Sequence, residues 1–65
     1  MKNGIRQARE TLGISQGELA RLIGTTQGAV SQWEKGTTSP STGKLIRLSE
    51  ILNTPVDKLL AREVG

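Results

Sequence analysis

Residues 16–33 read QGELARLIGTTQGAVSQW and carry the strongest indication of the fold. Within this stretch Ala20, Gly24, Val30 and Trp33 lie four, eight, fourteen and seventeen residues after Gln16. A small residue lets a second helix come close, and a glycine can end a helix in the left-handed conformation. Val30 and Trp33, three residues apart, share one face of the helix that follows. The spacing therefore predicts two short helices packed across a tight turn, a helix-turn-helix.

Helix start and stop signals divide the rest of the chain into short helices. The first is expected from about residue 2 to 12, where Gly13 ends it, and the second between Ser15 and Gly24. Glu18 stands three residues after Ser15, which predicts a capping box. Thr25 or Thr26 is expected to cap the third helix, which runs to about residue 35.

A loop of turn formers, residues 36–40, precedes the fourth helix. Ser41 is expected to cap that helix and Asn53 to end it in the left-handed conformation. Thr54 and Pro55 are expected to open a short fifth helix, and residues 61–65 to fray. No segment alternates like a strand, so the sequence predicts an all-α, compact bundle of five short helices.

The apolar positions of these helices define the expected core. The first helix should contribute Ile5, Ala8 and Leu12, which share one face; the second Leu19, Ala20, Leu22 and Ile23; the fourth Leu45, Leu48, Ile51 and Leu52. At 65 residues we expect one domain, residues 1–65, with a marginal core.

Composition excludes several classes of function. The chain has no Cys and no His, which removes disulfides, the usual general base and the commonest metal ligands, so neither catalysis nor a metal site is expected. No membrane span, secretory signal or cofactor motif is visible, which favours a cytoplasmic protein without cofactor or small-molecule ligand. The net charge of +3 suits a polyanionic partner, although many domains of this size carry as much. With Trp33 as the single aromatic residue, a platform for single-stranded nucleic acid is not expected.

The chain resembles the Cro/CI-type (XRE-like) helix-turn-helix family of phage repressors and small bacterial regulators, whose domain is lambda-repressor-like. The resemblance covers nearly the whole chain. It rests on Ile5-Arg6-x-Ala8-Arg9, Leu12-Gly13-Ile14-Ser15-Gln16, Glu18-Leu19-Ala20, Gly24, Gln27, Val30-Ser31-x-Trp33-Glu34, Gly36, Pro40-Ser41, Leu45, Leu48, Leu52 and Val56-Asp57-x-Leu59-Leu60. It implies a five-helix domain that binds operator DNA as a dimer, with the third helix reading bases and the fifth contributing to dimerisation.

The outer arc of the third helix holds the candidate base contacts. At about 100° per residue, the polar arc opposite Val30 and Trp33 contains no acid, and it comprises Gln27, Gly28, Ser31, Gln32 and Lys35. By resemblance Gln27 and Gln32 are the first candidates and Ser31 the next, and Ala29 could meet a thymine methyl. Gly28 leaves two readings open, a close approach of the backbone to DNA or a sparse readout.

Candidate contacts to the DNA backbone surround that helix, and they are Gln16, Gly17, Thr26, Lys35, Thr37, Thr38, Ser39 and Lys44. A solvated loop is an equal alternative for each of Lys35, Thr37, Thr38, Ser39 and Lys44 taken singly. The resemblance implies that Gln16 touches a phosphate and braces Gln27. It also implies a partly buried ion pair between Arg9 and Glu34.

These observations favour a sequence-specific regulator, most simply a repressor that occupies a near-palindromic operator as a weak homodimer. The apolar residues Val56, Leu59, Leu60 and Val64 are candidate dimer contacts, or they cap the core of the monomer. The chain fits either a Cro-like protein or the DNA-binding domain of a longer repressor. Two alternatives stay open: an antitoxin that also represses its own promoter, and a protein-interaction module on the same fold.

Overall fold

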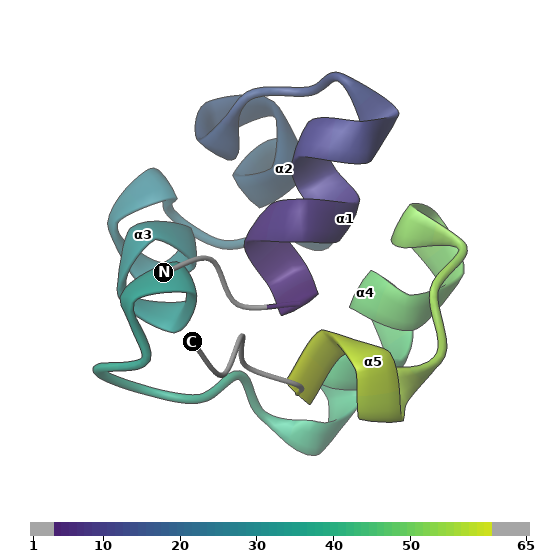
Figure 1. Ribbon diagram of the computed structural model, residues 1–65. Helices are drawn as coiled ribbons and strands as arrows, with labels where there is room; N and C mark the ends of the chain where they lie inside the picture. The colour runs from purple at the N-terminus through teal and green to yellow at the C-terminus, as the bar shows by residue number, and fades with distance from the viewer. Residues whose placement is uncertain (1–3, 61–65) are drawn as a thin grey trace.

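The computed structural model describes residues 4–60 of the chain and contains five α-helices in this part (Figure 1). They are α1 (Gly4–Leu12), α2 (Gln16–Ile23), α3 (Gln27–Lys35), α4 (Thr42–Leu52) and α5 (Val56–Leu60). Residues 4–60 contain no strand, and the all-α bundle of five short helices predicted from the sequence is confirmed. The predicted start of the first helix, near residue 2, and the predicted frayed tail, residues 61–65, lie outside the described residues.

Most of the predicted helix ends are also confirmed. The hydroxyls of Ser15, Thr26 and Ser41 each accept a hydrogen bond from the backbone N–H three residues later. Gly24 (φ 84°) and Asn53 (φ 50°) end α2 and α4 in the left-handed conformation. These contacts satisfy backbone groups that a helix end leaves without partners.

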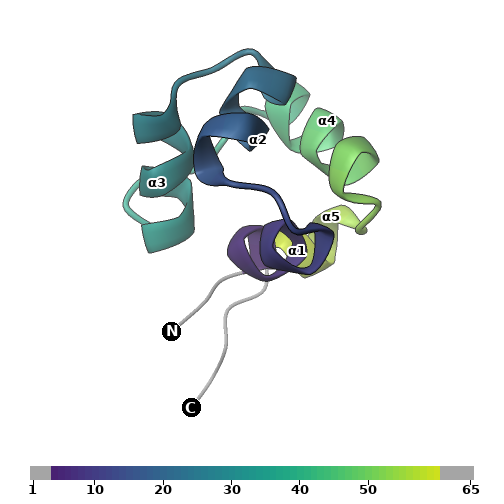
Figure 2. The same cartoon turned by 90° about the horizontal axis from the view of Figure 1, so that it is seen from above.

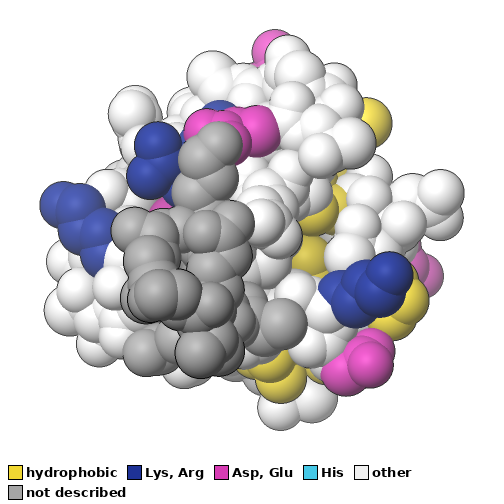
Figure 3. Space-filling model, viewed as in Figure 1, with side chains coloured by type: hydrophobic (Ala, Val, Ile, Leu, Met, Phe, Trp, Pro, Cys, Tyr) yellow, Lys and Arg dark blue, Asp and Glu magenta, His cyan; other side chains and the backbone are white. Residues whose placement is uncertain are grey.

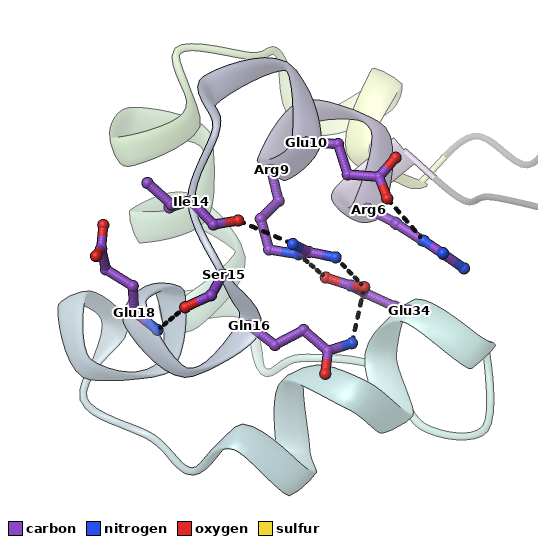
Figure 4. A network of polar contacts seen from close by, with 8 residues as sticks. All are labelled: Arg6, Arg9, Glu10, Ile14, Ser15, Gln16, Glu18 and Glu34. Atoms are coloured by element: carbon purple, nitrogen blue, oxygen red, sulfur yellow. Dashed lines mark hydrogen bonds and ion pairs between the residues drawn. The ribbon is translucent and has the colours of Figure 1, made fainter.

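Two capping details differ from the prediction. Only half of the capping box at α2 is formed, since Ser15 Oγ accepts from Glu18 N at 3.0 Å but the Glu18 carboxylate points away from Ser15 (Figure 4). Thr54 does not use its hydroxyl to cap α5. It donates instead to the Leu52 carbonyl at 2.9 Å, because the turn at Asn53 folds Thr54 back over the end of α4.

The helices pack around one core to which all of them contribute. Seen from above, α2 lies between α3 and α4, and α1 lies with α5 on the other side of the core (Figure 2). The buried apolar residues are Ile5, Leu19, Ala20, Ile23, Val30, Trp33, Leu48, Leu52 and Leu59. The core therefore holds α3 in place through Val30 and Trp33.

Two leucines predicted for the core are largely outside it. Leu12 is 50% exposed and Leu22 is 37% exposed. The last turn of α1 extends beyond the core, so Leu12 lines an open groove of about 420 Å³ between α1 and the turn that joins α4 to α5. Figure 3 shows hydrophobic side chains in this groove. Helical periodicity places a residue on a face, but the neighbouring helices decide how far along that face the core extends.

Candidate nucleic-acid interface

The structure presents the predicted polar arc of α3 to solvent. Gln27, Gly28, Gln32 and Lys35 are exposed, while the opposite face of α3 is buried through Val30, Trp33 and Glu34. Ser31 and Ala29 are half-buried, and Ala29 packs against the core. The outermost candidates for base contact are therefore the two glutamines and Gly28, with Ser31 and Ala29 at the edges of the arc.

The N-terminus of α2 lies directly beside the N-terminus of α3. A Cβ added to Gly17 would stand 3.6 Å from Gln27 Oε1. Gln16 and Gly17 are half-buried at this junction, and Thr26 is exposed while its hydroxyl accepts from Ala29 N at 3.1 Å. Both helix starts thus border the exposed face of α3, where backbone N–H groups of a helix can meet phosphate oxygens.

The remaining candidates for phosphate contact follow α3. Lys35, Thr37, Thr38 and Ser39 are exposed, and Lys44 at the start of α4 is half-buried. The loop turns sharply at Gly36 (φ 79°), and the backbone N–H of Thr37 donates to Gln32 O at 3.0 Å. A polar segment therefore continues the outer face of α3 at its C-terminal end.

A buried carboxylate connects α3 to α1 and α2. The Glu34 residue is 6% exposed, and its two oxygens accept from Arg9 Nε at 2.6 Å and Arg9 Nη2 at 3.1 Å (Figure 4). Arg9 Nη1 donates to the Ile14 carbonyl at 2.8 Å. This bidentate geometry is the strong form of an arginine–carboxylate pair. The two residues expected to pair do so, and they tie the end of α1 to the end of α3.

Gln16 has a different partner from the expected one. Its Nε2 donates to Glu34 Oε1 at 3.0 Å rather than bracing Gln27. The cause is the position of Glu34, whose carboxylate lies between Arg9 and Gln16 and accepts hydrogen bonds from both. The sequence carried no signal for this contact, because only the packing of α2 against α3 brings Gln16 to the acceptor positions of Glu34 that the Arg9 guanidinium leaves open.

The pair also changes the acidity of Arg9. Its hydrogen bond to Glu34 raises the pKa of the Arg9 guanidinium above the ordinary value, the nearby charges of Glu34 and Glu10 add to this effect, and partial burial opposes it. Arg9 is therefore a permanent cation that balances the Glu34 carboxylate beneath Gln16.

The candidate dimer residues do not share one environment. Leu59 is 1% exposed and belongs to the core of the monomer, which is the second of the two roles that the sequence left open for it. Leu60 is 55% exposed, Val56 is half-buried, and Val64 lies outside the described residues. Leu59 is buried because α5 packs with its inner face against α1 and α4.

The part of the chain at residues 4–60 has no group of three or more acidic, His or Cys side chains that could hold a metal ion. None of its helices is long and apolar enough to span a membrane.

The sequence profile of the helix-turn-helix family matches residues 5–59. Among curated proteins the chain is similar to repressor protein C2 of Salmonella phage P22, at 38% identity over 65 residues, which are 100% of this chain and 30% of that protein. It is also 40% identical over 52 residues to a transcriptional regulator of Sinorhizobium medicae, covering 80% of this chain and 37% of that protein. The chain thus spans about a third of the length of these relatives.

Solved structures show the same architecture. The P22 c2 repressor protein, in complex with a synthetic operator, has a TM-score of 0.81 at 39% identity, covering 86% of this chain and 85% of that chain. The N-terminal DNA-binding domain of SinR from Bacillus subtilis has a TM-score of 0.77 at 31% identity, covering 94% of this chain and 90% of that chain.

Proposed function

The chain belongs to the helix-turn-helix family, and from this premise we propose that it binds double-stranded DNA in a sequence-specific manner and regulates transcription. Residues 1–65 then act as a single DNA-binding domain. One observation carries the proposal: the outer arc of α3 is polar, exposed and free of acids, while the opposite face is anchored in the core by Val30 and Trp33. A helix presented in this way suits the width of the major groove.

In the proposed complex, α3 enters the major groove and its glutamines contact base edges. A glutamine amide both donates and accepts, which matches the N6 and N7 atoms of adenine. Gln27 and Gln32 are the principal base contacts, with Gly28, Ala29 and Ser31 along the same arc. The surrounding residues contact the sugar-phosphate backbone, and they are Gln16, Gly17, Thr26, Lys35, Thr37, Thr38, Ser39 and Lys44.

The proposed mode of action is repression by occupancy. Two copies of the chain bind a near-palindromic operator with their α3 helices about one turn of DNA apart, roughly 34 Å. Binding at that site blocks polymerase. The similarity to repressor protein C2 of phage P22, whose name includes this activity, supports this direction of control. Such a protein acts in the bacterial cytoplasm, where the DNA is.

Selection from randomised duplex DNA tests the proposal. The chain is incubated with a random library at two salt concentrations, and the bound duplexes are sequenced. We expect enrichment of a motif with two half-sites and an affinity that falls steeply as the salt concentration rises. Salt-sensitive binding without enrichment contradicts sequence-specific recognition, and the absence of binding would favour a protein-interaction module.

A further inference from the structure

The contact between Gln16 and Glu34 fixes which way the Gln16 amide faces. A carboxylate only accepts hydrogen bonds, so the amide nitrogen of Gln16 must be the atom that faces it. Nε2 donates to Glu34 Oε1 at 3.0 Å, and the amide oxygen consequently points toward α3 (Figure 4). One proton of Nε2 is used in this bond, and the second one is left for another acceptor.

Gln16 stands where the proposed DNA surface begins. It is the first residue of α2, and the next residue, Gly17, adjoins the side chain of Gln27 at the start of α3. Glu34 is on the buried side of this junction, with a side chain only 3% exposed. Gln16 therefore connects a buried carboxylate to the rim of the exposed arc of α3.

We propose that Glu34 is a positioning residue for DNA binding, which holds the Gln16 amide so that its second Nε2 proton can be donated to a phosphate of the DNA backbone. The inference rests on the proposed function and deepens it. The ordering of the Gln16 side chain that binding requires is then already met in the free protein.

Arg9 makes this arrangement compatible with a polyanion. An unpaired carboxylate behind Gln16 would repel the phosphate that Gln16 is to bind. The guanidinium of Arg9 neutralises Glu34 through two hydrogen bonds, at 2.6 and 3.1 Å. The network thus offers a fixed donor at the surface and carries no net charge beneath it.

A double-mutant cycle on DNA affinity tests the inference. The ion pair is replaced by Arg9→Met together with Glu34→Met, which leaves the net charge unchanged, and Gln16→Met is made alone and in the triple variant. The probe is a duplex of arbitrary sequence, about 20 base pairs or two turns long, at low salt, because a phosphate contact does not depend on sequence. Circular dichroism establishes that each variant is folded at the temperature of the titration.

We expect the Arg9/Glu34 replacement and Gln16→Met each to weaken duplex binding roughly 2- to 10-fold. In the Gln16→Met background, the ion-pair replacement should cost nothing further. The matched control is Arg6→Met with Glu10→Met, which removes the exposed ion pair of α1 (3.2 Å) with the same charge balance and should leave the affinity unchanged. Two results overturn the inference. One is a loss of affinity in the triple variant equal to the sum of the losses from the ion-pair replacement and from Gln16→Met. The other is an unchanged affinity in the variant that lacks the ion pair.

A second measurement on the unaltered chain covers the case in which the ion-pair variant does not fold. In the NMR spectrum of the free protein, the side-chain amide of Gln16 should be ordered, and that of the exposed Gln32 should be mobile. Equal mobility of the two amides overturns the inference. If the unaltered chain binds no duplex, the proposed function fails and the inference falls with it. If the unaltered chain and the Met variants bind the duplex equally well, the inference is wrong but the proposed function stands.

Discussion

At the scale of single residues, some glycines of this chain are required by their backbone conformation and others are not. Gly13, Gly24 and Gly36 have φ near 80°, where other residues are strained. Gly28 has no such reason: a Cβ there would meet only Thr26 Oγ1, at 3.9 Å. The fold does not require a glycine at position 28, and this position lies on the arc proposed to face DNA. A substitution of Gly28 can therefore distinguish an effect on DNA binding from an effect on stability.

We therefore expect Gly28→Ala to stabilise the protein, by about 0.5 kcal/mol or a few degrees in Tm, because alanine is the better helix former and fits the space. The control is Gly24→Ala, which should lower the Tm because its φ is 84°. Thermal unfolding followed by circular dichroism measures both. A lower Tm for Gly28→Ala would refute the prediction. The DNA affinity of Gly28→Ala tests the two interpretations of this residue. A lower affinity indicates that the backbone at Gly28 closely approaches DNA, and an unchanged affinity indicates that no base is contacted there.

Glu34 is expected to matter more for folding than for base preference. Glu34→Ala leaves Arg9, whose side chain is 11% exposed, without its carboxylate, and removal of one partner from a buried pair costs about 3 kcal/mol. In a domain of this size that corresponds to a fall in Tm of more than ~10 °C. The motif enriched from random DNA should keep its sequence. Equal Tm values for variant and parent would contradict this prediction.

At the scale of helices, the contact between α1 and α5 depends on the smallest side chain. Gly4 is buried, and a Cβ added to it would stand 1.8 Å from the Lys58 carbonyl oxygen and 2.8 Å from Leu59 Cα. Because these are backbone atoms, no rotamer change can relieve the overlap. The first turn of α1 therefore packs against the backbone of α5 itself.

Gly4→Ala should force α5 away from α1 and lower the free energy of unfolding by about 2 kcal/mol or more. Gly43→Ala in α4 is the matched control, because a Cβ there meets nothing within 4 Å. That variant should be neutral or slightly stabilising. Denaturant titrations of both proteins measure the difference, and equal midpoints would show that α5 adapts without cost.

At the scale of the whole molecule, the two neighbouring leucines of α5 should have separate roles. Leu59 is 1% exposed in the core and Leu60 is 55% exposed. Leu59→Ala should lower the free energy of unfolding by about 2–5 kcal/mol, as large-to-small changes in a core do. Leu60→Gln should leave stability within about 0.5 kcal/mol and weaken self-association, measured by sedimentation equilibrium. Unchanged self-association in Leu60→Gln would remove α5 from the proposed dimer interface.

Local sequence patterns were sufficient to predict the helices and the polar arc of α3. Helix ends depend on contacts within a few residues, such as a hydroxyl that accepts from the third N–H or a residue in the left-handed conformation, and these were predicted at Ser15, Gly24, Ser41 and Asn53. The polar face of α3 followed from a period of 3.6 residues. The resemblance of residues along nearly the whole chain implied the helix-turn-helix family, and the profile of that family matches residues 5–59.

Which apolar residues are buried and which polar groups meet depends instead on how the helices pack. Leu12 and Leu59 look alike as helical leucines, yet one is 50% and the other 1% exposed. The hydrogen bond from Gln16 to Glu34 joins residues 18 positions apart, on α2 and α3. Periodicity assigns a residue to a face of an isolated helix, whereas burial and hydrogen-bond partners depend on where the other helices end and how closely they approach.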